Sequence, residues 1–361
     1  MVTAVTTTAA TTAAMAVLVA TCGLCGCTGT DRHPAPDPSR SRYPTELPTR
    51  PAPSRATVGD GRSTPVADPV YPEHGNPAID VLHYNLSLTW SPTARILTGT
   101  ATVTVRIVTP VDEIRLDFSP AYRLDATGLD GLDAPARWHG GDLVLAAGRR
   151  LARETVVTVL VRYHGTPKDS PFPGARSDVP SVGIRTSEDG ALWAMQEPYG
   201  AFTWFPCSDQ PSDKAMFDLA VTAPAGWTGV SGGTLAATTT AADGATTTHW
   251  HGASPAATYL TAFAVDRFER FTESGPGGLP VTYWVRREDA ERMLPVIRKT
   301  PQMLEWLQQH FGPYPFRTAG VVVVPDRSAM ETQAMISMGP LVGYRGETVL
   351  LHELSHQWFG D

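Results

Sequence analysis

The chain has 361 residues, of which 42% are apolar and 18% are charged, and it carries a formal net charge of -7. This composition is typical of a folded globular protein with room for two domains, and the negative charge argues against nucleic acid as a partner. Three of its four cysteines, Cys22, Cys25 and Cys27, lie close together, and Cys207 stands far downstream, so no disulfide framework is predicted.

The first predicted element is an export signal over residues 1–27. Residues 15–25 form an apolar stretch that is too short to span a bilayer but is typical of the hydrophobic part of a signal peptide. The run Leu-Cys-Gly-Cys that ends at Cys27 resembles a lipoprotein processing site, in which Cys27 would carry a lipid and attach the protein to a membrane. Residues 1–14 contain no Lys or Arg, which a signal peptide normally has, so an unstructured Ala/Thr-rich tail remains the alternative.

A Pro-rich linker is predicted next, over residues 28–75. Ten prolines lie between Asp31 and Pro72, separated by arginines and small polar residues. Such a segment buries too little apolar surface to fold, and proline keeps it extended. We therefore expect a disordered stalk in front of the folded part of the chain.

Residues 76–275 are predicted to form a mainly antiparallel β-sandwich or saddle domain. Apolar residues alternate with polar ones over residues 84–90 and 103–107, which is the pattern of strands with one buried face. Further short strand candidates follow at residues 143–145, 156–161, 217–221 and 259–265.

The pattern changes to mixed helix and strand over residues 276–361. Apolar residues recur at helical spacing between Glu288 and Phe311, and the prolines at positions 295 and 301 predict two helices there rather than one. A wholly apolar run, Val321–Val324, predicts a buried strand. We expect this segment to be the first part of an α+β domain that is incomplete at Asp361.

The last predicted helix, Glu347–Gly360, carries a His-Glu-x-x-His motif. At about 100° per residue, His352 and His356 lie on one side of the helix, about 40° apart, opposite a leucine face. Both imidazoles can therefore reach one metal ion, and Glu353 beside them can accept a proton from water without being a ligand. The alternative is a buried helix whose two histidines only bond to neighbouring residues.

The run His-Glu-Leu-Ser-His-Gln-Trp-Phe-Gly-Asp from His352 to Asp361 resembles the active-site helix of the aminopeptidase N-like gluzincins, peptidase family M1. Residues 328–332, Ser-Ala-Met-Glu-Thr, resemble the Gly-Ala-Met-Glu-Asn motif of that family and depart from it at both ends. Residues 196–211, which begin Gln-Glu-Pro-Tyr-Gly-Ala-Phe, resemble a third family stretch. The resemblance covers about residues 76–361, and it implies a thermolysin-like catalytic domain.

The resemblance also implies a site. One zinc ion per chain would be bound by His352 and His356, and the third ligand would be a glutamate about eighteen residues beyond His356, past the chain end. An oxyanion-stabilising tyrosine would follow later. Glu353 would be the catalytic base. The carboxylates of Glu331 and Glu197 would bind the α-amine of the substrate. Ala329 and Met330 would contribute main-chain contacts to the peptide.

The sequence therefore predicts an exported, extracellular or cell-surface zinc aminopeptidase that acts on peptides with a free N-terminus. Residues 1–361 alone are expected to bind zinc weakly and to hydrolyse nothing. Two alternatives remain: a thermolysin-like endopeptidase, and a non-catalytic surface-anchored β-sandwich protein with a degenerate metal site. For Glu331 and Glu197 the alternative role is that of ordinary loop glutamates.

Overall fold

The computed structural model describes residues 60–174 and 179–360. The predicted export signal, Cys27 and the linker up to residue 59 lie outside the described residues. Among the residues that are described, none of the helices combines the length and the apolar character needed to cross a membrane.

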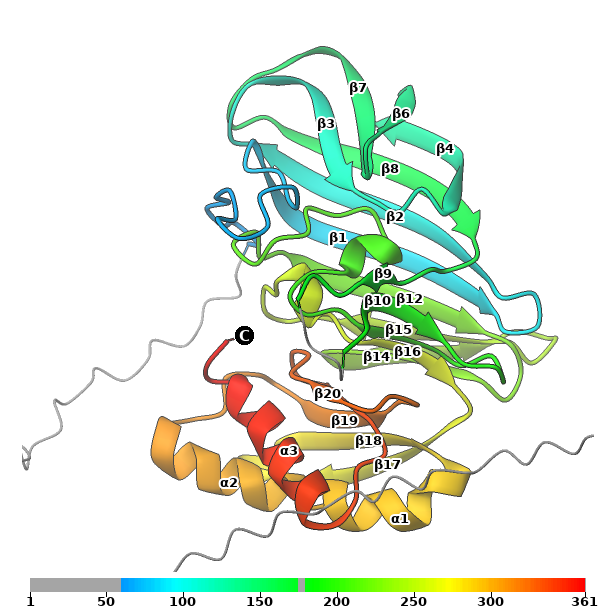
Figure 1. The fold of residues 1–361 in the computed structure, drawn as a ribbon, viewed down its shortest axis with the longest axis vertical. Coiled ribbons are helices and arrows are strands. Elements are labelled where there is room, and N and C mark those ends of the chain that lie inside the picture. Colours follow the sequence, from blue (N-terminus) through cyan, green and yellow to red (C-terminus); the bar gives the residue numbers. More distant parts are fainter. Residues whose placement is uncertain (1–59, 175–178, 361) are drawn as a thin grey trace, which may run out of the picture. The chain divides into compact units, whose positions relative to one another are not determined.

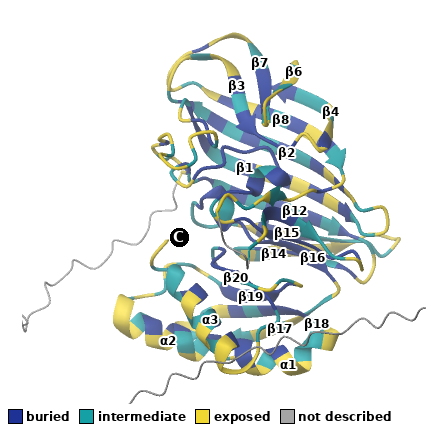
Figure 2. Cartoon of the chain, viewed as in Figure 1, coloured by how far each residue is buried: buried dark blue, intermediate teal, exposed yellow. Residues whose placement is uncertain are grey.

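The largest sheet has eight strands in the order β14-β15-β12-β1-β2-β8-β4-β5 (Figure 1). Its strands alternate buried and more exposed side chains, so one face contributes to a core, as the alternating sequence pattern predicts (Figure 2). All of its neighbouring strands are antiparallel except β1 and β12, which pair in parallel. The strands are β1 (Ile79–Ser91), β2 (Ile96–Ile107), β4 (Tyr122–Leu129), β5 (Leu132–Asp133), β8 (Val156–Gly165), β12 (Met216–Ala223), β14 (Thr234–Thr240) and β15 (Thr246–His251).

Two smaller sheets complete the first region, and they confirm the predicted mainly antiparallel β domain. Their strands are β3 (Val111–Asp117), β6 (Ala136–His139) and β7 (Asp142–Leu151) in one sheet, and β9 (Ser170–Pro171), β10 (Ser181–Thr186), β11 (Leu192–Met195), β13 (Thr228–Ser231) and β16 (Phe263–Asp266) in the other. The strand predicted over residues 259–265 was wrong in its first part, because Thr258–Leu260 forms a short 3₁₀ helix that turns the chain before β16.

Residues 60–75 correct the linker prediction, which extended to residue 75. The backbone N–H of Ser63 donates to Asp80 Oδ1 (3.1 Å), and the N–H of Gly75 donates to Asp117 Oδ2 (2.9 Å). Both carboxylates are buried, at 0% and 3% exposure, and need donors that water does not supply there. The prediction failed because proline content does not reveal that buried carboxylates of distant strands bind this backbone.

A third buried carboxylate near this segment makes stability depend on pH. Asp213 is 0% exposed and accepts the N–H of Val81 (3.0 Å). Burial, with a smaller contribution from Asp80, raises the pKa of Asp213 to about 7, although its hydrogen bonds act in the opposite direction. A raised pKa means that the carboxyl stabilises the fold fully below its unfolded pKa and loses that contribution as the pH rises through about 7.

Replacing Asp213 by asparagine removes this titration. The unfolding free energy of the Asp213→Asn variant, relative to wild type, should rise with pH by about 1.4 kcal/mol per unit between about pH 4 and 7. Urea unfolding of both proteins at several pH values measures this difference, in which other titrating groups cancel. A difference that is flat across this range contradicts the assignment of a raised pKa.

The second region combines a five-stranded mixed sheet, in the order β17-β18-β19-β21-β20, with three helices (Figure 1). The segment predicted to be two helices is two helices, because α1 ends at Ile297 and α2 carries Pro301 in its first turn, where a missing N–H is harmless. The elements are β17 (Phe268–Ser274), β18 (Pro280–Arg286), β19 (Ala319–Val323), β20 (Ala329–Met330), β21 (Ile336–Met338), α1 (Arg287–Ile297), α2 (Thr300–Phe311) and α3 (Gly343–His356).

Strand β19 is buried on both faces, which explains its wholly apolar sequence. Val321 and Val323 belong to the core formed with the helices, together with Leu350 and Leu354 of α3. Val322, on the opposite face of the strand, belongs to the core of the first region. The sheet is therefore fixed from both sides, and it positions the segment between β19 and β21 against α3.

Helix α3 begins and ends four residues earlier than predicted. It spans Gly343–His356, and the chain then turns tightly, with the N–H of Phe359 donating to the carbonyl of His356 (2.9 Å). The predicted leucine face is correct, since Leu350 and Leu354 are 0% and 1% exposed. The turn after His356 matters for the site, because it returns a backbone carbonyl to that histidine's side chain.

Candidate metal centre

The two histidines of α3 face each other at one end of the helix. His352 is exposed and His356 is half-buried, while the leucines of the opposite face anchor the helix in the core. The Nε2 atoms of the two rings are 3.3 Å apart. The i, i+4 spacing places the two rings on the same side of the helix, and the buried leucine face turns that side away from the core. The two nitrogens therefore lie side by side.

This spacing fits a shared zinc ion. Two nitrogen ligands at about 2.0–2.1 Å from a tetrahedral zinc ion lie about 3.3–3.4 Å from each other, which matches the Nε2–Nε2 distance. The Nδ1 atom of His356 lies 3.0 Å from the carbonyl oxygen of Phe359. A donating Nδ1–H fixes the tautomer and leaves the Nε2 lone pair free for a metal.

Glu353 lies next to this pair but is turned inward. It is 7% exposed, and burial raises its pKa to about 8, with further contributions from Glu331 and Glu197. A cation bound between the imidazoles would oppose this rise, because positive charge favours the carboxylate. The side chain thus has the burial and surroundings of a group that can accept a proton.

Glu331 and Glu197 come from distant parts of the chain. Glu331 follows β20 and is 7% exposed, whereas Glu197 follows β11 and is exposed. Burial raises the pKa of Glu331, and Glu197 adds to the rise, while a hydrogen bond from its own backbone and the nearby His356 oppose it. The structure therefore brings Glu331, Glu197 and Glu353 into electrostatic contact.

These three carboxylates share one property. Within residues 60–174 and 179–360, none of them has a Lys or Arg nitrogen within 4.0 Å, although most buried carboxylates elsewhere in the chain are paired or hydrogen-bonded. Unpaired buried carboxylates, as in Glu331 and Glu353, are unfavourable unless a cation binds to them. The site is therefore suited to hold positive charge.

Ala329 and Met330 form the short strand β20, which pairs antiparallel with β21. In the part of the chain that the structure describes, β20 is the edge strand of its sheet. Met330 is buried, and its sulfur accepts the N–H of Gln196 (3.3 Å), which ties β20 to the end of β11. An edge strand beside the carboxylates offers backbone groups to an extended peptide.

Sequence reasoning missed Gln357, which connects α3 to the Glu331 loop. Its Nε2 donates to the carbonyl of Glu331 (2.9 Å), and its Oε1 accepts the N–H of Ala334 (2.8 Å). Gln357 is 3% exposed, so both bonds are shielded from water. Its place directly after His356 was the available signal, but its partners lie more than twenty residues earlier in the chain.

Replacing Gln357 by leucine should loosen this loop. Two buried backbone groups would lose their partners, at about 1–3 kcal/mol each, so the unfolding free energy should fall by a few kcal/mol. Hydrogen exchange at the amide of Ala334 should accelerate more than exchange in β19. The Gln357→Glu variant keeps the acceptor for Ala334 and serves as the matched control, with the smaller effect at that amide. Equal protection at Ala334 in all three proteins would contradict the role of Gln357.

The described residues contain no cluster of three His, Cys, Asp or Glu side chains arranged to hold a metal ion. Of the predicted metal ligands, only His352 and His356 lie within the part of the chain that the structure describes. The predicted glutamate beyond His356 stays a prediction.

Comparison with known proteins agrees with these features. Residues 81–260 match the family model described as the peptidase M1 N-terminal domain. The human endoplasmic reticulum aminopeptidase 1 is 26% identical over 315 residues, which cover 78% of this chain and 32% of that protein. The human glutamyl aminopeptidase is 28% identical over 180 residues, covering 46% and 19%. The chain thus spans about a fifth to a third of the length of these relatives.

Solved structures extend the likeness over both regions. A mutant M1 zinc metallopeptidase from Deinococcus radiodurans bound to a Tyr-Ser-Ala substrate matches with a TM-score of 0.71 and 30% identity, covering 84% of this chain and 68% of that one. A two-domain M1 zinc metallopeptidase mutant bound to L-tryptophan matches with a TM-score of 0.72, at the same identity and coverage. The chain belongs to the aminopeptidase N-like M1 family of zinc metallopeptidases.

Proposed function

We propose that the protein of which these residues are part is a zinc aminopeptidase that removes residues from peptide N-termini. One observation carries the proposal: an imidazole pair at zinc-ligand spacing lies beside three carboxylates that have no cationic partner among the described residues. A zinc ion would compensate part of this negative charge, and a substrate α-ammonium would compensate the rest.

His352 and His356 would hold the zinc ion, and a third protein ligand would have to come from outside the described residues. When bound, zinc supplies Lewis acidity toward the scissile carbonyl and lowers the pKa of a water molecule. Glu353 would accept the proton of the attacking water on its carboxylate and deliver it to the leaving amine. The Phe359 carbonyl would hold the His356 ring in its ligating orientation through Nδ1.

Glu331 and Glu197 would set the exopeptidase register. A free α-ammonium group is the cation that an aminopeptidase substrate presents one residue from the scissile bond. The buried Glu331 carboxylate would bind it by a charge-assisted hydrogen bond, with Glu197 at the more exposed side. The β20 edge, Ala329 and Met330, would align the backbone of the peptide.

The test compares substrates with free and acetylated N-termini, using the full-length protein loaded with zinc. An aminopeptidase hydrolyses aminoacyl-p-nitroanilides and leaves the N-acetyl analogues intact. Cleavage of N-acetylated peptides at internal bonds would favour a thermolysin-like endopeptidase instead. Zinc binding without hydrolysis of any substrate would favour the non-catalytic alternative.

We also propose export with a lipid on Cys27. The support is the apolar stretch of residues 15–25 and the cysteine after Leu-Cys-Gly, both of which lie outside the described residues. Metabolic labelling with a fatty acid should mark the wild-type protein and leave the Cys27→Ser variant unlabelled. Equal labelling of both proteins, or none of the wild type, would contradict lipidation at this residue.

A further inference from the structure

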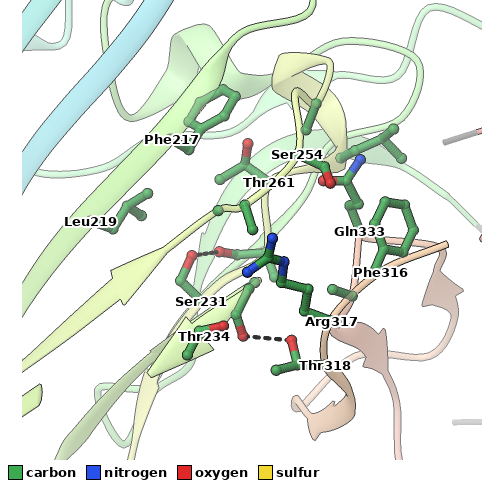
Figure 3. A pocket seen from close by; sticks show the side chains of 18 residues that line it. Phe217, Leu219, Ser231, Thr234, Ser254, Thr261, Phe316, Arg317, Thr318 and Gln333 are labelled. Atoms are coloured by element: carbon green, nitrogen blue, oxygen red, sulfur yellow. Dashed lines mark hydrogen bonds between the residues drawn. The ribbon is translucent and has the colours of Figure 1, made fainter. Parts of the chain in front are cut away.

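A hollow separate from the candidate metal centre lies between the first region and the segment that leads into β19 (Figure 3). About 520 Å³ of empty space lies within it, part of which is open solvent at its mouth. Its wall is formed by β12, by the turn between β13 and β14, by residues 252–262, and by the loops before β19 and after β20.

Arg317 is the only charged side chain among the described residues that line this hollow. It is exposed, and no carboxylate of the described residues lies within 4.0 Å of its guanidinium. Figure 3 shows the side chain extending from the loop before β19 into the hollow, toward the wall that carries Ser231. Many of the other described arginines pair with an acid, so Arg317 is a cation available to a ligand.

The rest of the lining is apolar or hydroxylic. Phe217 and Leu219 of β12, with Leu260 and Phe316, provide apolar surface around the hollow. Thr261 lines the wall with a buried hydroxyl that has no hydrogen-bond partner among the described residues. One guanidinium matches one anionic group, and the apolar side chains match an apolar body.

The hollow also touches the back of the loop that carries Glu331. Gln333 and Ala334, which lie two and three residues after Glu331, are part of the lining. The N–H of Gln333 donates to the carbonyl of Leu260 (2.9 Å), and its Nε2 donates to the carbonyl of Pro255 (3.1 Å).

Gly232 in the wall approaches this loop so closely that a Cβ there would lie 2.6 Å from the carbonyl oxygen of Gln333. The wall and the loop therefore form one packed unit, in which neither can shift without moving the other.

We propose that this hollow binds a small monocarboxylate with an apolar body, whose carboxylate pairs with Arg317. The ligand class follows from the single unpaired guanidinium and the aromatic and aliphatic lining. A ligand bound in the hollow would displace Gln333 and so change the position of Glu331 relative to a substrate amine. This coupling, unlike the binding itself, rests on the proposed aminopeptidase function.

The probe is N-acetyl-L-phenylalanine, whose acetylated amine has no charge for the carboxylates of the metal centre to bind. Its neutral amide, N-acetyl-L-phenylalaninamide, is the matched ligand without the carboxylate. Calorimetric titration of the full-length protein should show binding of the acid and about tenfold weaker binding of the amide. The Arg317→Gln variant should bind the acid about tenfold more weakly, and Arg123→Gln, at an exposed arginine on β4, should bind it like wild type.

Equal affinity for acid and amide, unchanged affinity in Arg317→Gln, or no binding up to about 10 mM would each overturn the site. The coupling is tested separately: saturating N-acetyl-L-phenylalanine should change KM for a free-amine substrate in wild type and not in Arg317→Gln. An unchanged KM would overturn the coupling and leave the site standing. If the protein proves to have no peptidase activity, the titration still decides the site.

Discussion

Replacing Glu353 by glutamine is expected to lower kcat by about 10²–10⁴-fold while zinc remains bound. Glutamine keeps the size of the side chain but cannot accept the proton of an attacking water. Glu353 is buried next to the two Nε2 atoms but is not itself one of the predicted metal ligands. The substitution therefore leaves both histidine ligands in place. The measurement combines kcat with the zinc content of the purified variant.

The matched control for this variant lies on the same helix. Glu347 is part of α3 and pairs with Lys299 (2.6 Å) away from the histidines, so Glu347→Gln should retain kcat within about threefold. Loss of zinc together with activity in Glu353→Gln would assign this carboxylate a ligand role instead. Full activity in the variant would contradict its role as the base.

Replacing Glu331 by glutamine is expected to lower kcat/KM for substrates with a free N-terminus by about 10–150-fold, mainly through KM. A charge-assisted hydrogen bond in a buried site contributes about 1.5–3 kcal/mol, and glutamine offers only a neutral acceptor. The zinc content should stay that of wild type. Steady-state kinetics with one aminoacyl substrate at fixed pH measures the effect.

Glu197 provides the comparison for Glu331. It is exposed, so water screens its interaction with a substrate amine, and Glu197→Gln should have a smaller effect on kcat/KM. An equal or larger effect at Glu197 would contradict the assignment of Glu331 as the principal amine ligand. An unchanged kcat/KM in Glu331→Gln would support the reading of this residue as an ordinary loop glutamate.

The sequence predicted those parts of the fold whose signal is local. Alternation of apolar residues identified β1 and β2. The helical segment is divided in two as predicted, with Pro301 in the first turn of α2, although Pro295 lies inside α1. The His-Glu-x-x-His spacing placed two imidazoles on one face of α3, where their Nε2 atoms are 3.3 Å apart. In each case the decisive interactions lie within a few residues of one another.

The parts that sequence reasoning missed depend on contacts between distant segments. Residues 60–75 fold because Asp80 and Asp117 accept their N–H groups, which proline content cannot reveal. The role of Gln357 follows from two backbone groups more than twenty residues before it. The hollow at Arg317 is lined by segments that range from β12 to the loop after β20, so no single stretch of the sequence predicts it.

The most direct test of the account is zinc-edge anomalous diffraction from crystals of the protein grown with zinc. The account predicts a single strong peak about 2.0–2.1 Å from the Nε2 atoms of both His352 and His356. A crystal with full zinc occupancy elsewhere, and no peak between these two imidazoles, would contradict the central claim that they form the metal centre.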